Sequence, residues 1–244
     1  EVLGFSFVYS GNFLAQVEVD TYDTTRVLMG IHPHCFSWNL TNTESFQTPE
    51  VVMVYSDQGL NKMSRTYHSL YQKRLVRGYH RDLPRPILIN SWEGTYFDFD
   101  EEKIIQMAKK AQKLGIELFV LDDGWFGHRN DDHSSLGDWF VNLDKLPDGI
   151  GSLATQIHDL GLQFGLWFEP EMVSYDSNLY RQHPNWLLKT PDRRLSHGRN
   201  QYVLDFSNPE VVTYIYDLMV KIIEEAQLDY IKWDMNRSMS EVYS

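Results

Sequence analysis

Residues 114–123 read Leu-Gly-Ile-Glu-Leu-Phe-Val-Leu-Asp-Asp, and residues 160–169 repeat this pattern as Leu-Gly-Leu-Gln-Phe-Gly-Leu-Trp-Phe-Glu. A looser third copy, Leu-Asp-Tyr-Ile-Lys-Trp-Asp, occupies residues 228–234. Each copy joins a short apolar run, typical of a buried strand, to a carboxylate at its end. Gly115 and Gly161 are suited to end the helices that precede the first two copies. The repeat therefore predicts strands that alternate with helices.

The segments between the copies have the spacing of amphipathic helices. We expect a helix capped by Asp100 and ending at Gly115, and further helices over 152–160 and 209–227. A first strand is expected at 87–92. This alternation indicates parallel strands with helical crossovers, in either an open doubly wound sheet or a (β/α)8 barrel. No glycine-rich phosphate loop follows the first strand, and every strand ends in polar or aromatic residues, so we favour the barrel.

The N-terminal third has a different pattern. Short apolar or β-branched runs are separated by polar turns, which is typical of a β-sandwich, and a helix is expected over 62–77. The segment Asp82-Leu-Pro-Arg-Pro86 has two prolines and no periodicity. We predict that residues 1–82 form a β-sandwich or part of one. Residues 83–244 are expected to form the first half of the barrel, about four β/α units, and hence a fragment, since a closed barrel needs eight strands.

Composition excludes several partners. The 244 residues contain 34 Asp+Glu against 22 Lys+Arg, a net charge of −12. This argues against nucleic acid and against an anionic membrane surface, which both need clustered cations. No apolar run is long enough to span a membrane, no secretory signal is visible, and the single cysteine, Cys35, fits a reducing compartment, so we expect a cytoplasmic protein.

Neither a metal nor a cofactor is expected. His32-Pro-His34-Cys35 contains ligand-type residues but lacks a second ligand pair. Loop residues 128–133 include two histidines and two aspartates without a metal-binding spacing, and we interpret them as a solvated loop.

Carboxylates at strand ends, beside tryptophans, suit glycoside hydrolysis, in which one carboxylate attacks the sugar and another protonates the leaving oxygen. Asp234 is the best single candidate. The period of a strand places it on the same face as Lys232, and a neighbouring cation keeps a nucleophilic carboxylate ionised. A structural ion pair at the end of the strand is the alternative.

Asp122 and Asp123 end the second strand, where at least one of them can accept hydrogen bonds from sugar hydroxyls. A solvated turn before Gly124 is the alternative. Trp92 and Trp167 could each offer a flat platform to a sugar ring, although tryptophans near barrel strands more often belong to the core.

The roles of three further charged residues remain open. Arg199 follows His197-Gly198 in a loop, where it could bind hydroxyls, hold a carboxylate or lie on the surface. Glu169 and Glu171 flank a proline, and they could accept sugar hydroxyls or hold Lys232 and Arg199 in place.

Five stretches, taken together, make the chain resemble the α-galactosidases (melibiases) of glycoside hydrolase family 36. They occur in the family's order: Asn90-Ser-Trp-Glu-Gly94, Leu121-Asp-Asp-Gly-Trp-Phe126, Gly165-Leu-Trp-Phe-Glu-Pro-Glu-Met172, His197-Gly-Arg-Asn-Gln-Tyr-Val-Leu-Asp205 and Lys232-Trp-Asp-Met-Asn-Arg237. The resemblance covers almost the whole chain. It implies that residues 1–82 are the C-terminal part of an N-terminal β-sandwich domain and that residues 83–244 belong to the catalytic barrel.

The resemblance implies a retaining mechanism with Asp234 as the nucleophile. The family's acid/base is an aspartate from a later strand, which no residue here matches, so the chain alone is expected to be inactive. The other implied site residues bind galactose: Asp122 and Asp123 through its hydroxyls, Trp92, Trp167, Arg199 and Lys232 along the wall of the site, and Asn236 on the side of the 2-hydroxyl.

The implied substrates carry a terminal α-linked galactose, as melibiose and raffinose do, and the resemblance also implies a homo-oligomeric full-length protein without a cofactor. Three other functions stay open. One is an α-N-acetylgalactosaminidase, another a galactosyl-transferring relative, and the third a non-catalytic galactose-binding fragment.

Overall fold

The computed structural model describes residues 1–34, 36–240 and 242–244. Cys35 lies outside the described residues. It is the residue on which the expected reducing compartment rests, and one of the ligand-type residues at 32–35. The chain forms two compact units, Glu1–Arg85 and Pro86–Ser244, which divide within the proline-containing segment. Each unit is described by itself.

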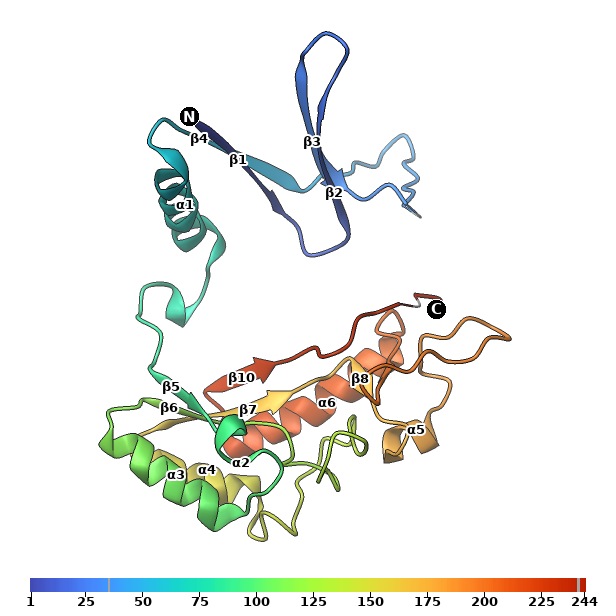
Figure 1. Ribbon diagram of the computed structural model, residues 1–244. Coiled ribbons are helices and arrows are strands. Elements are labelled where there is room, and N and C mark those ends of the chain that lie inside the picture. Colours follow the sequence, from blue (N-terminus) through green and yellow to red (C-terminus); the bar gives the residue numbers. More distant parts are fainter. Residues whose placement is uncertain (35, 241) are drawn as a thin grey trace. The chain divides into compact units, whose positions relative to one another are not determined.

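The first unit contains two antiparallel strand pairs. Strand β1 (Val2–Val8) pairs with β4 (Glu50–Ser56), and β2 (Phe13–Val19) pairs with β3 (Thr25–Ile31) as a hairpin (Figure 1). The alternating apolar residues of these strands are only partly covered within the unit.

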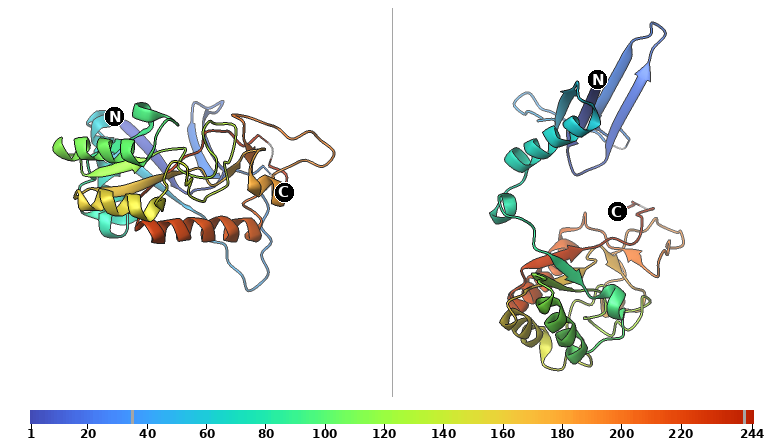
Figure 2. Two further views of the ribbon diagram at one scale, coloured as in Figure 1. Left: turned by 90° about the horizontal axis from the view of Figure 1, so that it is seen from below. Right: turned by 60° about the vertical axis from the view of Figure 1, so that its left-hand side comes forward.

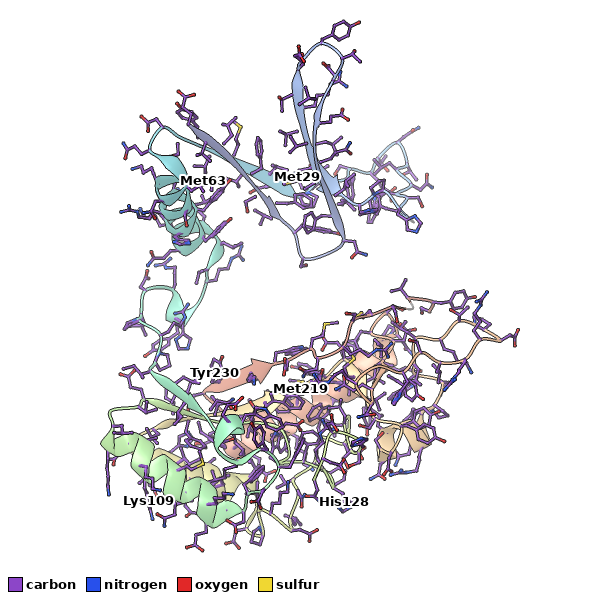
Figure 3. All side chains as sticks on the ribbon, viewed as in Figure 1. Met29, Met63, Lys109, His128, Met219 and Tyr230 are labelled. Carbon is purple, nitrogen blue, oxygen red and sulfur yellow. The ribbon has the colours of Figure 1, made fainter. Side chains whose placement is uncertain are left out.

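Helix α1 (Gly59–Leu70) packs on β1 and β4 and continues as a π-helical turn, η1 (Tyr71–Leu75). Gly4 allows this close approach, because a Cβ atom there would lie 2.5 Å from the sulfur of Met63. Figure 3 labels Met63 on α1. A 3-10 turn, η2 (Tyr79–Arg81), leads to the end of the unit.

The second unit is built on a parallel sheet, as the repeat predicts. Strands β5 (Leu88–Asn90), β6 (Leu118–Leu121), β7 (Gln163–Phe168) and β10 (Tyr230–Trp233) lie in the order β10-β7-β6-β5. The expected first strand ends two residues early, because Trp92 begins a short helix. The α/β class and the parallel pairing are confirmed.

Three helices cover one face of this sheet: α3 (Glu101–Lys113), α4 (Gly149–Asp159) and α6 (Pro209–Ala226) (Figures 1 and 2). They follow one another in chain order, and each crosses from one strand to a later one. Asp100 caps α3 by accepting the N–H of Lys103, which confirms the expected start of that helix.

The ends of the helices also follow the sequence. Gly115 and Gly161 have φ angles of +77° and +78° just after α3 and α4, a conformation that glycine adopts without strain. α4 begins at Gly149, three residues before the expected start at Ser152.

Side chains alternate across the strands, so successive residues of a strand point to opposite faces of the sheet. Phe119 and Leu121 of β6, with Phe164, Leu166 and Phe168 of β7, are fully buried in the core that the helices complete. Met219, labelled on α6 in Figure 3, belongs to the same core. The intervening residues therefore point to the opposite face.

Short elements and loops surround the carboxyl ends of the strands. They comprise α2 (Trp92–Thr95), α5 (Asn178–Gln182), the paired strands β8 (Met172–Val173) and β9 (Tyr202–Val203), and a long loop between β6 and α4. None of the helices in the described ranges combines the length and the apolar content that crossing a bilayer requires.

Candidate active site

A pocket of about 370 Å³ lies at the carboxyl ends of the four parallel strands. All eight residues that the sequence singled out as nucleophile or sugar-binding side chains line this pocket: Trp92, Asp122, Asp123, Trp167, Arg199, Lys232, Asp234 and Asn236. They come from five separate segments of the chain. The structure therefore brings the candidates together, while their roles remain predictions.

Asp122 is the hub of one side of the pocket. Its Oδ2 accepts hydrogen bonds from Asn90 Nδ2 at 2.5 Å and from Lys232 Nζ at 2.7 Å. Its Oδ1 accepts the N–H of Asp123 at 2.9 Å. Asp122 thereby joins β5, β6 and β10. The Asp122 side chain is 5% exposed and that of Lys232 is 38% exposed, so the carboxylate is buried while the lysine remains open to solvent.

Asp234 lies at the other side, where three N–H groups donate to it. Oδ2 accepts from Trp167 Nε1 and from Asn236 Nδ2, both at 2.9 Å, and Oδ1 accepts the N–H of Met235 at 2.9 Å. Burial raises the pKa of this carboxyl, but the three hydrogen bonds and the charge of Lys232 outweigh it, so the pKa lies below the usual range. Asp234 is therefore ionised at neutral pH.

The expected pairing of Lys232 with Asp234 is wrong in its detail. Lys232 bonds to Asp122, and its charge is the smallest of the effects that lower the pKa of Asp234. Trp167 and Asn236 supply the larger part of that stabilisation.

The two tryptophans differ in their surroundings. Trp167 is 2% exposed, its ring stacks within 5° of parallel on Phe126, and Trp125 Nε1 donates to its backbone carbonyl. It therefore belongs to the core as well as to the wall of the pocket. Trp92 is partly exposed at the start of α2, where Phe97 packs edge-on against its ring.

Asp123 is held by an arginine that the sequence did not single out. Arg129 Nε and Nη2 donate to the two oxygens of Asp123, each at 2.8 Å, and both side chains are buried. Burial raises the pKa of Asp123, while the bidentate arginine favours its ionised form. Arg129 lies in the irregular loop after β6, where no periodicity could have revealed its position.

The sequence did not single out Lys145 either, which lies in the same loop. Its Nζ donates to the carbonyls of Phe97, Gly124 and Arg129, each at 3.0 Å. Burial lowers the pKa of Lys145 to about 8. One ammonium group therefore links the segment at Phe97 to two positions of the loop after β6, one of them next to Asp123 in the sequence.

Arg199 occupies a strained turn. Gly198 and Gln201 exchange backbone hydrogen bonds, and the two residues between them, Arg199 and Asn200, have φ angles of +52° and +58°. Positive φ at both central positions is the requirement of a type I′ turn, which normally favours Asn and Gly. Arg237 braces this turn, since its Nη1 donates to the carbonyl of Gln201 at 3.0 Å.

Glu169, fully buried at the end of β7, lines the pocket but bonds to neither Lys232 nor Arg199. Its carboxylate accepts the backbone and side-chain N–H groups of Asn236 and the side-chain amide of Gln201 at 3.1 Å. Burial raises the pKa of Glu169, and the Asn236 hydrogen bonds act in the opposite direction.

Glu171 lies outside the pocket. Its two oxygens accept from Trp233 Nε1 at 3.0 and 3.2 Å, on an exposed part of the surface. The alternative in which Glu171 holds Lys232 or Arg199 is therefore wrong.

Two side chains from loop residues 128–133, Arg129 and Asp132, line the pocket. His133 pairs with Asp132 at 3.0 Å, and both are well exposed. No group of three or more His, Cys, Asp or Glu side chains within the described ranges has the arrangement of a metal site.

Comparison with known families gives two matches along the chain. Residues 45–244 match the family model described as Melibiase. Residues 1–41 match the model described as the glycosyl hydrolase family 36 N-terminal domain.

Curated proteins with similar sequences include the α-galactosidase AgaA of Geobacillus stearothermophilus, 64% identical over the whole chain, and the α-galactosidase Mel36A of Lactobacillus acidophilus, 55% identical. The chain spans about a third of the length of these relatives, 34% and 33% respectively.

Solved structures are similar as well. The crystal structure of AgaA aligns over 98% of this chain and 33% of its own, with a TM-score of 0.93. The α-galactosidase of Lactobacillus brevis aligns over 99% of this chain, with a TM-score of 0.94. Variants of AgaA have been solved in complex with raffinose and with stachyose. The fold is thus the one that the relatives share, an α/β chain with part of a barrel after an N-terminal domain.

Proposed function

Because the chain belongs to the Melibiase family of glycoside hydrolases, we propose that it carries the nucleophile and the galactose-binding half of a retaining α-galactosidase. The single observation that carries the proposal is the ionised carboxylate of Asp234, which shares one pocket with Asp122, Asp123 and Lys232. Terminal α-linked galactose of raffinose-type oligosaccharides is the proposed substrate, by analogy with the sugars bound to AgaA variants.

In the proposed first step, Asp234 attacks the anomeric carbon. Each carboxylate oxygen can accept two hydrogen bonds. Oδ2 already accepts two, whereas Oδ1 accepts one, from Met235. We therefore assign Oδ1 as the attacking atom. The bond from Oδ1 to the anomeric carbon forms as the glycosidic bond breaks, and the leaving oxygen takes a proton from the acid/base.

In the second step, water displaces the carboxylate from the opposite face, and the galactose leaves with its original anomeric configuration. Trp167 and Asn236 stabilise Asp234 as a leaving group through the same two hydrogen bonds that lower its pKa. The acid/base would give up and regain one proton over the two steps.

The remaining candidates are proposed to recognise the sugar. Asp122 and Asp123 would accept hydrogen bonds from its hydroxyls, while Lys232 and Arg199 would donate hydrogen bonds to its oxygens. Trp92, the partly exposed tryptophan of the pocket, would pack against the ring. Burial of Asp122 and Asp123 supports this role, since a hydrogen bond to a shielded carboxylate discriminates strongly between sugars.

The acid/base is proposed to come from a later strand of the barrel, outside this chain. Glu169 is committed to Asn236 and Gln201, and Glu171 lies outside the pocket, so neither suits the role. The relatives are about three times as long as this chain, which supports the proposal. We therefore expect the 244 residues alone to bind galactose without hydrolysing galactosides.

Further features of the full-length enzyme are proposed on the same basis. Residues 1–82 would complete an N-terminal β-sandwich domain and residues 83–244 would be the first half of the catalytic barrel. A cytoplasmic, homo-oligomeric enzyme without a cofactor, acting on soluble oligosaccharides and not on nucleic acid or membranes, is consistent with the acidic composition.

The proposal is tested by trapping the covalent intermediate in the full-length enzyme. A fluorinated α-galactosyl fluoride, which slows the second step more than the first, should lose its anomeric fluoride and add one fluorogalactosyl mass to the peptide that contains Asp234. Proton NMR of early raffinose hydrolysis should show the α-anomer of galactose first. A label on a different residue, or the β-anomer as first product, would refute the assignment. Galactose binding without any turnover would point to the non-catalytic module instead.

A parallel assay addresses the other enzymatic alternatives. α-N-acetylgalactosaminides and galactosyl acceptors are offered to the same enzyme, and we expect hydrolysis of the α-galactoside to be the fastest of these reactions.

A further inference from the structure

Glu169 is the most deeply buried carboxylate of the pocket, and no step of the proposed reaction uses it. It is fully buried at the end of β7, and three N–H groups donate hydrogen bonds to it. An ionisable side chain is rarely placed in the core unless its hydrogen bonds serve a purpose. The identity of its partners indicates that purpose.

Two of the three N–H groups belong to Asn236, two residues after the nucleophile. The backbone N–H of Asn236 donates to Glu169 Oε1, and its side-chain Nδ2 donates to Oε2 at 3.3 Å. Gln201 Nε2 donates to the same Oε2 at 3.1 Å. Glu169 thus grips the main chain and the side chain of Asn236 at once.

The side chain of Asn236 connects Glu169 to the nucleophile. Its Nδ2 also donates to Asp234 Oδ2 at 2.9 Å, so both of its hydrogens are engaged by carboxylates. Ionised carboxylates only accept hydrogen bonds, and turning the amide over would set its Oδ1 against them. The two acidic groups therefore fix the orientation of the amide. Oδ1 has no donor among the residues that the structure describes.

We propose that Glu169 is a positioning residue, which holds Asn236 so that its Oδ1 accepts a hydrogen bond from the hydroxyl next to the anomeric carbon. The inference rests on the proposed function and deepens it. The family resemblance implies that Asn236 lies on the side of the 2-hydroxyl, and its hydrogen bond to Asp234, the proposed nucleophile, agrees with that place. The site therefore requires a hydrogen-bond donor at carbon 2.

The experiment measures how much the 2-hydroxyl contributes in the full-length enzyme. Dissociation constants for galactose and 2-deoxygalactose are compared by calorimetry, and kcat/KM is compared for a nitrophenyl α-galactoside and its 2-deoxy analogue. The variants are Glu169→Gln, Asn236→Ala and the double variant. Glutamine has the same size as glutamate but offers one acceptor fewer, so Asn236 loses half of its support.

The preference for the 2-hydroxyl is the ratio of kcat/KM, or of affinity, for the sugar with the hydroxyl to that for its 2-deoxy analogue. We expect this ratio to fall about tenfold in each single variant, the effect of one hydrogen bond. In the double variant it should fall no further than in Asn236→Ala, because Glu169 acts through Asn236. If the single effects multiply instead, or if Glu169→Gln loses thermal stability while keeping the wild-type preference, Glu169 is only structural and the inference is overturned.

Glu171→Gln is the matched control, since Glu171 lies across Pro170 from Glu169 but outside the pocket, and it should keep the preference. Glu169→Asp, which retains the charge but withdraws it from Asn236, replaces Glu169→Gln if the latter does not fold. The binding arm separates the two proposals. A shifted preference in a protein without turnover would uphold the role of Glu169 and refute the enzymatic function.

Discussion

Trp167 Nε1 donates a hydrogen bond of 2.9 Å to Oδ2 of Asp234, across the boundary between β7 and the segment after β10. Trp167 is buried in the core, so its indole is held rigidly and cannot turn away to solvent. A core side chain thus contributes to the lowered pKa of the proposed nucleophile.

Replacing Trp167 by Phe removes the indole donor and leaves the carboxylate with two N–H partners. The pKa of Asp234 should then rise, because a hydrogen bond to the ionised form is lost. The acidic limb of the pH profile of kcat/KM should move to higher pH. Trp125→Phe is the control, since Trp125 donates to a backbone carbonyl of the same cluster and should destabilise the core without moving that limb.

Asp234→Asn should lower kcat at least about 10³-fold, because the amide cannot form the galactosyl ester. Azide is small enough to enter the space beside the amide and attack the anomeric carbon. With an activated galactoside it should restore turnover and give β-galactosyl azide, which NMR identifies. Turnover near the wild-type rate without azide would contradict the nucleophile assignment.

Arg129→Met should destabilise the protein by about 3–5 kcal/mol, because it strands the buried carboxylate of Asp123 without a partner. Adding Asp123→Asn removes that charge, so the double variant should be more stable than Arg129→Met alone. Denaturant unfolding of the full-length enzyme measures both. Additive losses would mean that the two side chains do not interact energetically.

Lys145→Met leaves three backbone carbonyls without their shared donor and should cost about 3 kcal/mol of unfolding free energy. A pH effect follows from the lowered pKa, about 8 against an ordinary 10.5. Between these values the unfolded chain binds more protons than the folded one, so this lysine makes stability rise with pH there. The rise should be absent from the pH–stability curve of Lys145→Met and retained in that of Lys109→Met, an exposed control on α3.

Arg199→Asn should raise stability and lower activity together. Asparagine tolerates the positive φ of a type I′ turn better than arginine, which is worth about 0.5–1 kcal/mol. Loss of the guanidinium should reduce kcat/KM at least about tenfold if it donates to the sugar. Thermal unfolding and steady-state kinetics check the two halves, and unchanged activity would remove Arg199 from the sugar site.

The order of strands and helices in the second unit could be predicted from the sequence, because apolar periodicity and glycine caps are local signals. The convergence of strand ends on one pocket followed from the parallel arrangement. The register in which the strands pair could not be predicted from the sequence repeat. The repeated sequence aligns Phe119 with Gly165, whereas the ladder pairs Phe119 with Phe164, since hydrogen bonding across a twisted sheet need not match sequence repeats.

Specific partners were harder to predict than the site itself. Lys232 and Asp234 share a face, but same-face neighbours along a strand lie about 6.6 Å apart, and the long lysine side chain reaches Asp122 across the sheet instead. Arg129 and Lys145 lie in a loop without periodicity, where charged residues usually indicate solvent. Only the three-dimensional structure reveals that this loop folds back beneath Asp123.

Asp234, Asn236 and Arg237 reach three different neighbours within four positions: Trp167, Glu169 and the turn around Arg199. Inserting or deleting one residue here would misdirect all three side chains at once, even if their identities were kept. Chain length in this segment is thus as much a requirement of the pocket as composition. Efforts to alter the protein by loop grafting belong instead in the exposed stretch 191–194.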